Sequence, residues 1–158
     1  MDKNSEIDNT DIKILSALMK DAKTPYTEIA DYACVSGGTV HVRMKKMERL
    51  GIVTGSTLSI DFKKLGYDIT AFLGIYLLKN SLYEEVSKQL AEIPEVLTLH
   101  YTTGQYNIFA SIICRDTQHL RTVLHDKIQK ITGITRTETF ISLEERINKQ
   151  LKLDTVED

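Results

Sequence analysis

The sequence predicts an α+β protein in which a three-helix (winged) helix-turn-helix precedes a ferredoxin-like βαββαβ domain. Up to about residue 50 the apolar residues recur at helical spacing, and after about residue 55 the pattern changes to strands that alternate with helices. The length of 158 residues suits one domain or two small ones. We therefore expect a helix-turn-helix domain over residues 1–53, a linker strand or hinge over 54–67 and a ferredoxin-like domain over 68–153.

Three short helices are expected in the first domain. Capping and acidic residues at 8–11 suit the start of a helix, and Thr24-Pro25 suits the start of a second, because proline is favoured in the first turn. Ser36-Gly37-Gly38 ends the second helix, Ser36 can cap a third, and Gly51 stops it. The apolar residues expected on the inward faces are Ile14, Leu15, Leu18, Ile29, Ala30, Ala33, Val40, Met44, Met47 and Leu50.

The second domain is expected to be a four-stranded antiparallel sheet with both helices on one face. Gly104-Gln105 is typical of a hairpin between the two middle strands. The segment 52–60 is either a wing or a strand that leaves the first domain. The expected strands span 70–79, 95–103, 106–115 and 134–143, and the expected helices span 82–92 and 117–131.

Both faces of this sheet are apolar, although two helices can cover only one of them. Strand 70–79 carries apolar residues at consecutive positions, and strand 106–115 does the same. A dimer packed through the two sheets is the simplest way to cover the second face, and docking of the first domain there is the alternative. The residues expected on the second face are Phe72, Tyr76, Leu78, Phe109 and Ile113.

The third helix carries a basic cluster, although the chain has a net charge of −2. At about 100° per residue, its core stripe centres on Val40, Met44 and Met47, which leaves the opposite face free for DNA. The residues expected to read base edges are Thr39, His41, Val42 and Lys45, and those expected to bind phosphate are Lys46 and Arg49. The full set of candidate DNA-binding residues is Ser36, Gly38, Thr39, His41, Val42, Arg43, Lys45, Lys46 and Arg49. The alternative for each charged residue is a solvated surface side chain.

Arg43 lies near the edge of the core stripe rather than opposite it, and Asp11 lies on the inward face of the first helix. We predict that these two residues form an ion pair that fixes the third helix against the first. The alternative is that Arg43 reaches a DNA phosphate.

The sequence argues against several other classes of protein. No apolar run approaches the roughly 18 residues that span a bilayer, so we expect no membrane partner, and the polar start of the chain is unlike a signal peptide. The four histidines are scattered without a metal-site or catalytic motif, so we expect no enzyme activity, no metal and no cofactor. We interpret Cys34 and Cys114 as small buried side chains in a reducing cytoplasm.

Four segments together resemble the Lrp/AsnC (feast/famine) family of regulators over nearly the whole chain. The first, 7–11 with Ile14-Leu15, resembles the opening of that family, and the second, 35–44 with 46–48, resembles its recognition helix. Tyr101-Thr102-Thr103-Gly104-Gln105-Tyr106-Asn107-Ile108-Phe109 and Gly133-Ile134-Thr135-Arg136-Thr137-Glu138-Thr139 resemble the signatures of its effector domain. The combination is most similar to the asparagine-responsive AsnC branch.

This resemblance implies that the second domain dimerises through its sheet, that dimers assemble into larger rings, commonly octamers, and that small amino acids bind at contacts between dimers. Many amino-acid-sensing relatives carry Asp where this chain has Asn107, which can meet an ammonium group only through a neutral carbonyl. The effector residues implied by the motifs are Tyr101, Thr103, Gly104, Gln105, Tyr106, Asn107, Thr135, Thr137 and Thr139.

We therefore expect a transcriptional regulator that binds double-stranded DNA and responds to a small amino acid, with asparagine the first effector to test. One alternative is an architectural protein that wraps DNA on an oligomer without a ligand. An enzyme would need a reactive cluster at 101–107, where the sequence offers only neutral polar groups.

Overall fold

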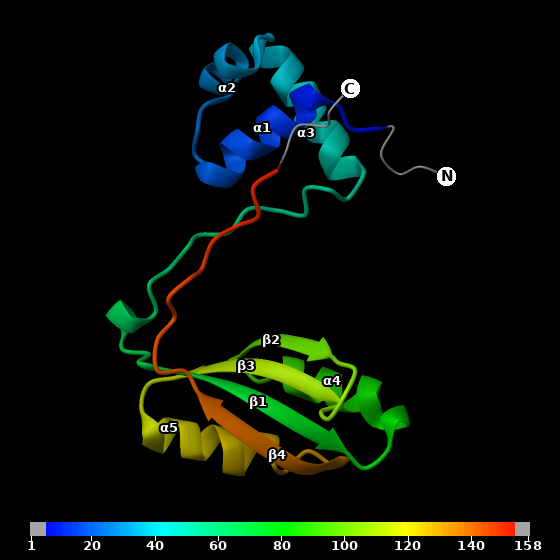
Figure 1. The fold of residues 1–158 in the computed structure, drawn as a ribbon, viewed down its shortest axis with the longest axis vertical. Coiled ribbons are helices and arrows are strands. Elements are labelled where there is room, and N and C mark those ends of the chain that lie inside the picture. Colours follow the sequence, from blue (N-terminus) through cyan, green and yellow to red (C-terminus); the bar gives the residue numbers. More distant parts are fainter. Residues whose placement is uncertain (1–5, 154–158) are drawn as a thin grey trace. The chain divides into compact units, whose positions relative to one another are not determined.

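The computed structural model describes residues 6–153 and divides them into two compact units. One unit comprises the described residues up to Ser59 together with 147–153, and the other comprises Ile60–Arg146 (Figure 1). The sequence-based boundaries differ from this division at both ends of the second unit. Residues 60–67 group with the sheet, and 147–153 group with the helical unit.

The first unit contains the three expected helices, α1 (Asn9–Lys20), α2 (Tyr26–Ala33) and α3 (Gly37–Arg49). Asp8 caps α1 by accepting a hydrogen bond from the backbone N–H of Asp11, and the Asp11 carboxylate accepts one from the N–H of Asp8. Ser36 caps α3 through the N–H of Thr39. The buried apolar side chains of this unit are Ile14, Ile29, Ala30, Ala33, Val40, Met44 and Met47.

Two expectations for the first unit are wrong. Cys34 is exposed rather than buried, because it occupies the left-handed C-cap of α2 (φ 56°, ψ 45°), where the chain turns at the surface, and Val35 packs against the core. Residues 52–59 contain neither helix nor strand, so the wing or strand left open by the sequence is not formed there.

Cys114, in the second unit, is buried as expected, and burial raises the pKa of its thiol to about 11.

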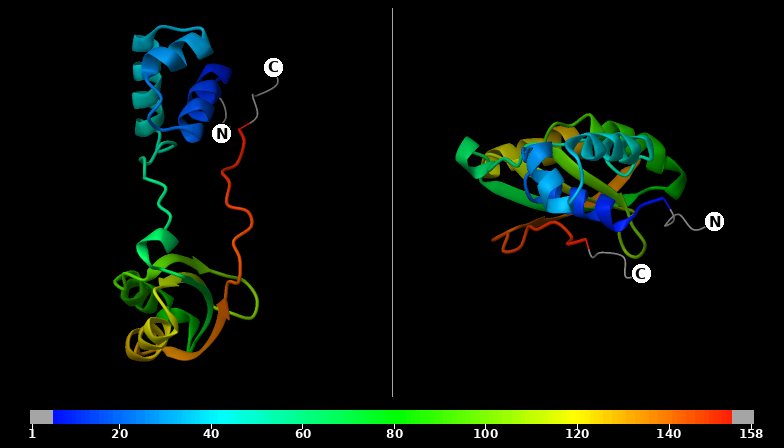
Figure 2. Two further views of the ribbon diagram at one scale, coloured as in Figure 1. Left: turned by 90° about the vertical axis from the view of Figure 1, so that its left-hand side faces the viewer. Right: turned by 90° about the horizontal axis from the view of Figure 1, so that it is seen from above.

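The second unit has the expected βαββαβ order, and its sheet has the strand order β2-β3-β1-β4 with every pair antiparallel (Figure 1). Its helices lie on one face of the sheet (Figure 2). The helix expected at 117–131 is in two parts, because an α-helical turn passes into a π-helix at Val123. The elements are η1 (Lys63–Leu65), β1 (Ile69–Leu77), η2 (Asn80–Leu82), α4 (Tyr83–Ala91), β2 (Val96–Tyr101), β3 (Ile108–Cys114), α5 (Thr117–Thr122), η3 (Val123–Ile128) and β4 (Ile134–Ile141).

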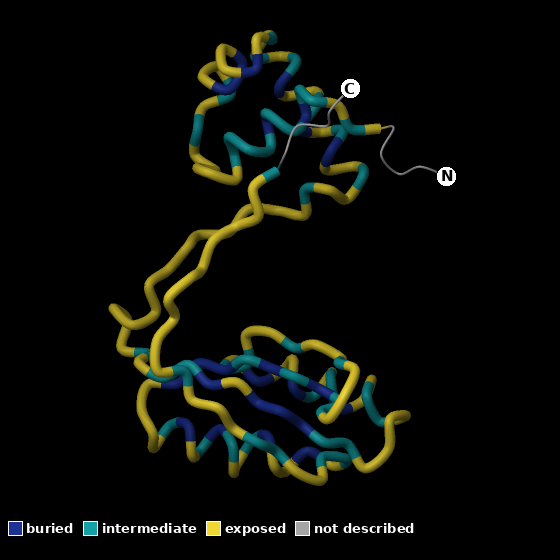
Figure 3. Tube along the Cα trace, in the orientation of Figure 1, coloured by how far each residue is buried: buried dark blue, intermediate teal, exposed yellow. Residues whose placement is uncertain are grey.

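Buried residues lie along the central strands of the sheet (Figure 3), and the two faces of the sheet have different surroundings. Leu73 and Ile75 of β1 share one core with α4, α5 and η3, whose residues Val86, Leu120 and Val123 are buried against them. The opposite face carries an aromatic cluster in which ring pairs lie 5.4–6.3 Å apart between centroids. Its members are Phe72, Tyr76, Tyr106, Phe109 and Phe140. Phe72 and Phe140 remain 37% and 46% exposed in the single chain.

Candidate DNA-binding surface and effector-domain sites

Helix α3 presents the outward face that its spacing predicts. Val40, Met44 and Met47 are buried, so the residues between them point away from the core. The exposed members of the predicted DNA-binding set are Ser36, Gly38, His41, Val42, Lys45 and Arg49. This arrangement leaves a basic and partly apolar helix face open to a DNA groove.

The hydroxyl groups at the start of α3 bind each other. Ser36 Oγ and Thr39 Oγ1 lie 2.9 Å apart, and Ser36 Oγ also accepts the N–H of Thr39 at 3.1 Å. Gly38 lies beside them, and a Cβ added there would meet only Ser36 Oγ, at 3.8 Å. The first turn is therefore rigidly capped and keeps open space at Gly38.

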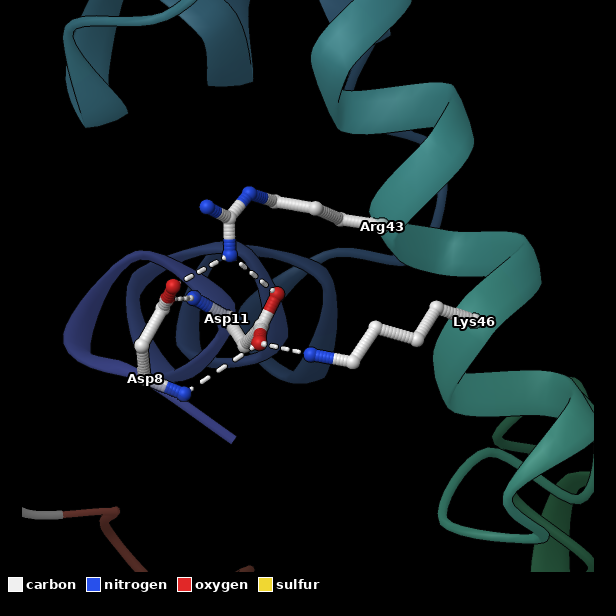
Figure 4. Close-up of polar contacts among 4 residues, drawn as sticks. All are labelled: Asp8, Asp11, Arg43 and Lys46. Carbon is white, nitrogen blue, oxygen red and sulfur yellow. Dashed lines mark hydrogen bonds and ion pairs between the residues drawn. The ribbon is translucent and has the colours of Figure 1, made fainter. Parts of the chain in front are cut away.

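A four-residue ionic cluster links the start of α1 to α3 (Figure 4). Arg43 Nη1 donates to Asp8 Oδ2 at 2.7 Å and to Asp11 Oδ1 at 2.9 Å. Lys46 Nζ lies 3.3 Å from Asp11 Oδ2. The predicted pairing of Asp11 with Arg43 is confirmed. Sequence reasoning missed Asp8 as a second acceptor and assigned Lys46 only to phosphate.

The charges within this cluster stabilise one another. Burial opposes ionisation of Asp8, but hydrogen bonds from Arg43 and from the backbone of Asp11 outweigh it and hold the pKa of Asp8 below its usual value. Hydrogen bonds to Asp11 and Asp8 raise the pKa of Arg43. Both pKa shifts favour the charged forms of Asp8 and Arg43, and the cations of Arg43 and Lys46 point from α3 toward the start of α1.

A concave surface of about 630 Å³ adjoins the cluster. Its lining combines the two cations of the cluster with the capped first turn and one apolar side chain of α3. The residues that line it are Asp8, Ser36, Gly38, Thr39, Val42, Arg43 and Lys46. Six of these seven belong to the predicted DNA-binding set, so one concave surface joins the ionic cluster to the first turn of α3.

The predicted effector residues between β2 and β3 fall into two groups. Tyr101, Thr103, Gly104 and Gln105 are exposed, and Gly104 has a φ of 102°, as a tight turn requires. Tyr106 is half-buried and folds back over the sheet. The turn therefore exposes its first residues, whereas the ring of Tyr106 packs over Gly74 of its own chain.

Asn107 is held by its own chain. Its Oδ1 accepts the N–H of Leu77 at 2.8 Å, and its Nδ2 donates to Asn80 Oδ1 at 2.7 Å. The side chain thus fastens the β2–β3 turn to the end of β1 and to η2. An effector ammonium could bind this amide only at Oδ1, which already accepts the N–H of Leu77.

Glu138 of β4 is the centre of a polar network that the sequence analysis missed. Tyr106 and Tyr76 donate to its two carboxylate oxygens at 2.8 and 3.1 Å, and Arg136 also binds it. Gln105 donates to the hydroxyl of Tyr76 at 2.8 Å. The hydrogen bond from Tyr106 holds the pKa of Glu138 below its usual value. Only the strand register could have revealed this network, because Tyr106 and Glu138 are 32 residues apart.

The predicted threonines of β4 lie apart from Tyr106 within one chain. Thr137 and Thr139 pair with Ile75 and Leu73, so they lie on the helix-covered face, whereas Tyr106 lies on the other. Thr135 Oγ1 donates to the backbone carbonyl of Tyr76 at 3.2 Å. A site that combines the turn with these threonines therefore needs the turn of one copy and the strand of another.

Comparisons with known proteins agree with this architecture. Regulatory protein AsnC from Haemophilus influenzae is 46% identical over 146 residues, which cover 92% of this chain and 97% of that protein. Regulatory protein AsnC from Escherichia coli K12 is 44% identical over 149 residues, which cover 94% and 98%. The structure of E. coli AsnC matches with a TM-score of 0.88 at 43% identity over 93% of this chain and 99% of that one. An AsnC-type helix-turn-helix domain matches residues 7–48, and an Lrp/AsnC ligand binding domain matches 70–151.

The chain belongs to the Lrp/AsnC family of transcriptional regulators.

The two Lrp/AsnC domain matches include nearly every predicted site residue. The match to the helix-turn-helix contains all of the predicted DNA-binding residues except Arg49, which follows its last residue by one, and the other match contains the whole effector set. A transcriptional regulator from Neisseria meningitidis in complex with L-methionine has a TM-score of 0.87 over 94% of this chain and 96% of that one, at 21% identity, which shows the same fold.

Over residues 6–153, this Lrp/AsnC protein has no helix that is long and apolar enough to cross a membrane. Within the same residues, no group of three His, Cys, Asp or Glu side chains is placed to hold a metal ion.

Proposed function

We propose that this regulator binds double-stranded DNA sequence-specifically through α3 and that a small amino acid bound between copies of the second unit modulates that binding. The observation that carries the proposal is the outward face of α3, where Lys45 and Arg49 are exposed beside a concave surface that Arg43 and Lys46 line. A DNA backbone supplies the phosphates that such cations bind. The relatives named Regulatory protein AsnC support the regulatory role.

The protein reads DNA as a dimer in this proposal. One copy of α3 offers few cations, and a second copy doubles the contacts and sets the spacing of half-sites. The aromatic cluster supports pairing through the sheets, because the partly exposed ring of Phe72 stacks on Phe109 and that of Phe140 lies beside Tyr106. Further assembly of the dimers, with an octamer as the first state to test, brings the β2–β3 turn of one copy to β4 of another.

The effector in this proposal is a small amino acid, with asparagine tested first. The matched family domain is described as ligand binding, and related structures hold L-methionine. The exposed backbone of the turn at Gly104 and the hydroxyls of Thr137 and Thr139 can bind an α-carboxylate and an ammonium group. We infer no catalytic role, because the turn offers only neutral polar groups.

DNA binding is tested with a site obtained by selection from random DNA. Affinity should fall steeply with salt, since each neutralised phosphate releases counterions. Lys45→Ala should reduce the preference for the selected site over random DNA, and Lys46→Ala should weaken binding to both about equally. If each variant loses the same factor in affinity for the selected site as for random DNA, this division between base and phosphate contacts is wrong. If no sequence is selected, sequence-specific binding is wrong.

The effector is tested by calorimetry and thermal shift with the twenty common amino acids. Heat of binding with asparagine, together with a change in DNA affinity, supports the proposal. No heat and no thermal shift with any of them supports the second candidate, an architectural protein that wraps DNA without a ligand. The hydrogen bond from the N–H of Leu77 to Asn107 Oδ1 favours that candidate, since Oδ1 is the only acceptor that this amide offers to an ammonium group.

A further inference from the structure

We propose that Val42 reads the 5-methyl group of a thymine in the major groove and is the residue through which α3 selects a T at one position of each half-site. This inference rests on the proposed DNA binding and adds a chemical identity to one contact. One residue of α3 is unusually exposed for its type. Val42 is 67% exposed, although it is a branched apolar residue in the middle of a helix with a well-formed core face.

The surroundings of Val42 favour contact with DNA over contact with another protein surface. Gly38 lies one turn earlier on the same face and has no side chain, and the space above its Cα is open apart from Ser36 Oγ at 3.8 Å. Lys45 and Lys46 follow within the next turn, and Val42 lines the concave surface that contains Lys46. An apolar side chain framed by cations suits a base edge flanked by phosphates.

The other side chains in the first two turns of α3 are less suited to reading a base. These turns contain no Asn or Gln, the residues that make paired hydrogen bonds to adenine. Thr39 shares a hydrogen bond with Ser36, and the ring of His41 lies 6.3 Å from that of Tyr26. The guanidinium of Arg43 is directed toward Asp8 and Asp11 (Figure 4).

Val42 is therefore the apolar side chain among these residues that can contact a base. Thymine is the base whose major-groove edge carries an apolar group. The C5 methyl group lies in the major groove, where α-helices bind, and its contact with an apolar side chain distinguishes T from C. Burial of one methyl group corresponds to about a fourfold change in affinity.

The test uses the full-length protein and a DNA site selected from random sequence. Each thymine of that site is replaced in turn by deoxyuridine, which removes only the methyl group. The wild-type protein should lose about fourfold in affinity at one thymine per half-site. Val42→Ala should bind the thymine site more weakly and should lose most of the difference between thymine and uracil there. Since Val42 is exposed and alanine favours helices, this variant should fold normally.

Lys45→Ala is the matched control on the same face. It should bind more weakly overall and should keep the preference for thymine over uracil. The inference is overturned if no thymine of the selected site responds to deoxyuridine, or if Val42→Ala responds as strongly as the wild type. Failure to select any DNA sequence would overturn the proposed function itself, whereas a selected site that is indifferent to deoxyuridine overturns only the role of Val42.

Discussion

Arg43 Nη1 lies 2.9 Å from Oδ1 of Asp11, and the side chain of Asp11 has no exposed surface. A buried carboxylate loses its hydration and needs hydrogen-bond donors in its place. Arg43, Lys46 and the backbone N–H of Asp8 supply those donors. The pair therefore joins the first turn of α1 to the middle of α3, and it fixes the helix that carries the proposed DNA contacts.

Asp11→Asn should destabilise the helix-turn-helix by about 1–3 kcal/mol, because it removes a charged acceptor from three donors. Hydrogen–deuterium exchange of the peptides that contain α1 and α3 measures this locally. Asp8→Asn is the matched control, since Asp8 is largely exposed and asparagine is an equally good N-cap. Its cost should stay below about 1 kcal/mol. Equal costs for the two variants would show that the buried position of Asp11 has no special importance.

Sequence patterns predicted the parts of this protein that depend on contacts within one helix or one face. The pairing of Asp11 with Arg43 followed from where each residue lies around its own helix. The second acceptor, Asp8, was missed because it precedes α1 and reaches Arg43 only through the angle between two helices. Helical spacing alone does not determine that angle.

The network around Glu138 could not be predicted, because it depends on how three strands are aligned. Gly74 pairs with Phe109 on one side and with Glu138 on the other, and the ring of Tyr106 lies over it. No local pattern places a turn residue across β1 in this way. The same register separates Thr137 from Tyr106 within one chain, although the two belong to one predicted effector site.

Gly74→Ala should destabilise the second unit by about 1–3 kcal/mol, because the added Cβ overpacks the sheet face. It would lie 2.4 Å from the ring of Tyr106, and displacement of that ring breaks the hydrogen bond to Glu138. Urea denaturation followed by circular dichroism measures the change.

The matched control for Gly74→Ala is Gly37→Ala in the first turn of α3. A Cβ at Gly37 meets no atom within 4 Å, and alanine favours helices. That variant should be as stable as the wild type or more stable by up to about 1 kcal/mol. If Gly74→Ala behaves in the same way, Tyr106 does not need the space above Gly74.

Glu95→Gln should reduce stability in a pH-dependent way. Glu95 accepts hydrogen bonds from Lys127 Nζ at 2.7 and 2.8 Å, and it lies 3.1 Å from Nε2 of His119. Burial acts to raise the pKa of Glu95, but the hydrogen bonds from Lys127, from its own backbone and from His119 outweigh burial and lower it. A lowered pKa in the folded state stabilises the fold above the pKa of the unfolded chain, and this contribution is lost as the pH falls through the folded value.

At pH 7 the Glu95→Gln variant should be about 1.5–3 kcal/mol less stable than the wild type. The difference should shrink as the pH falls below the usual glutamate pKa of 4.5, because the wild-type carboxylate then becomes protonated. Urea denaturation at a series of pH values measures it. Glu92→Gln, at an exposed position three residues earlier, should match the wild type throughout. A difference that stays constant with pH would mean that the charge of Glu95 does not stabilise the fold.

Arg43→Lys should separate the structural role of this residue from its role in DNA binding. Both hydrogen bonds to Asp8 and Asp11 use Nη1, and among residues 6–153 the Nε and Nη2 groups have no hydrogen-bond partner (Figure 4). Arg43 also lines the concave surface beside α3.

A lysine can still pair with Asp11, but it lacks the planar fork that would hold a phosphate at the same time. We therefore expect stability to change by less than about 1 kcal/mol and DNA affinity to fall about tenfold. Fluorescence anisotropy with the selected site and hydrogen–deuterium exchange of α3 measure the two effects. Unchanged DNA affinity in the stable variant would assign Arg43 to the fold alone, and the concave surface would then bind phosphate through Lys46 without it.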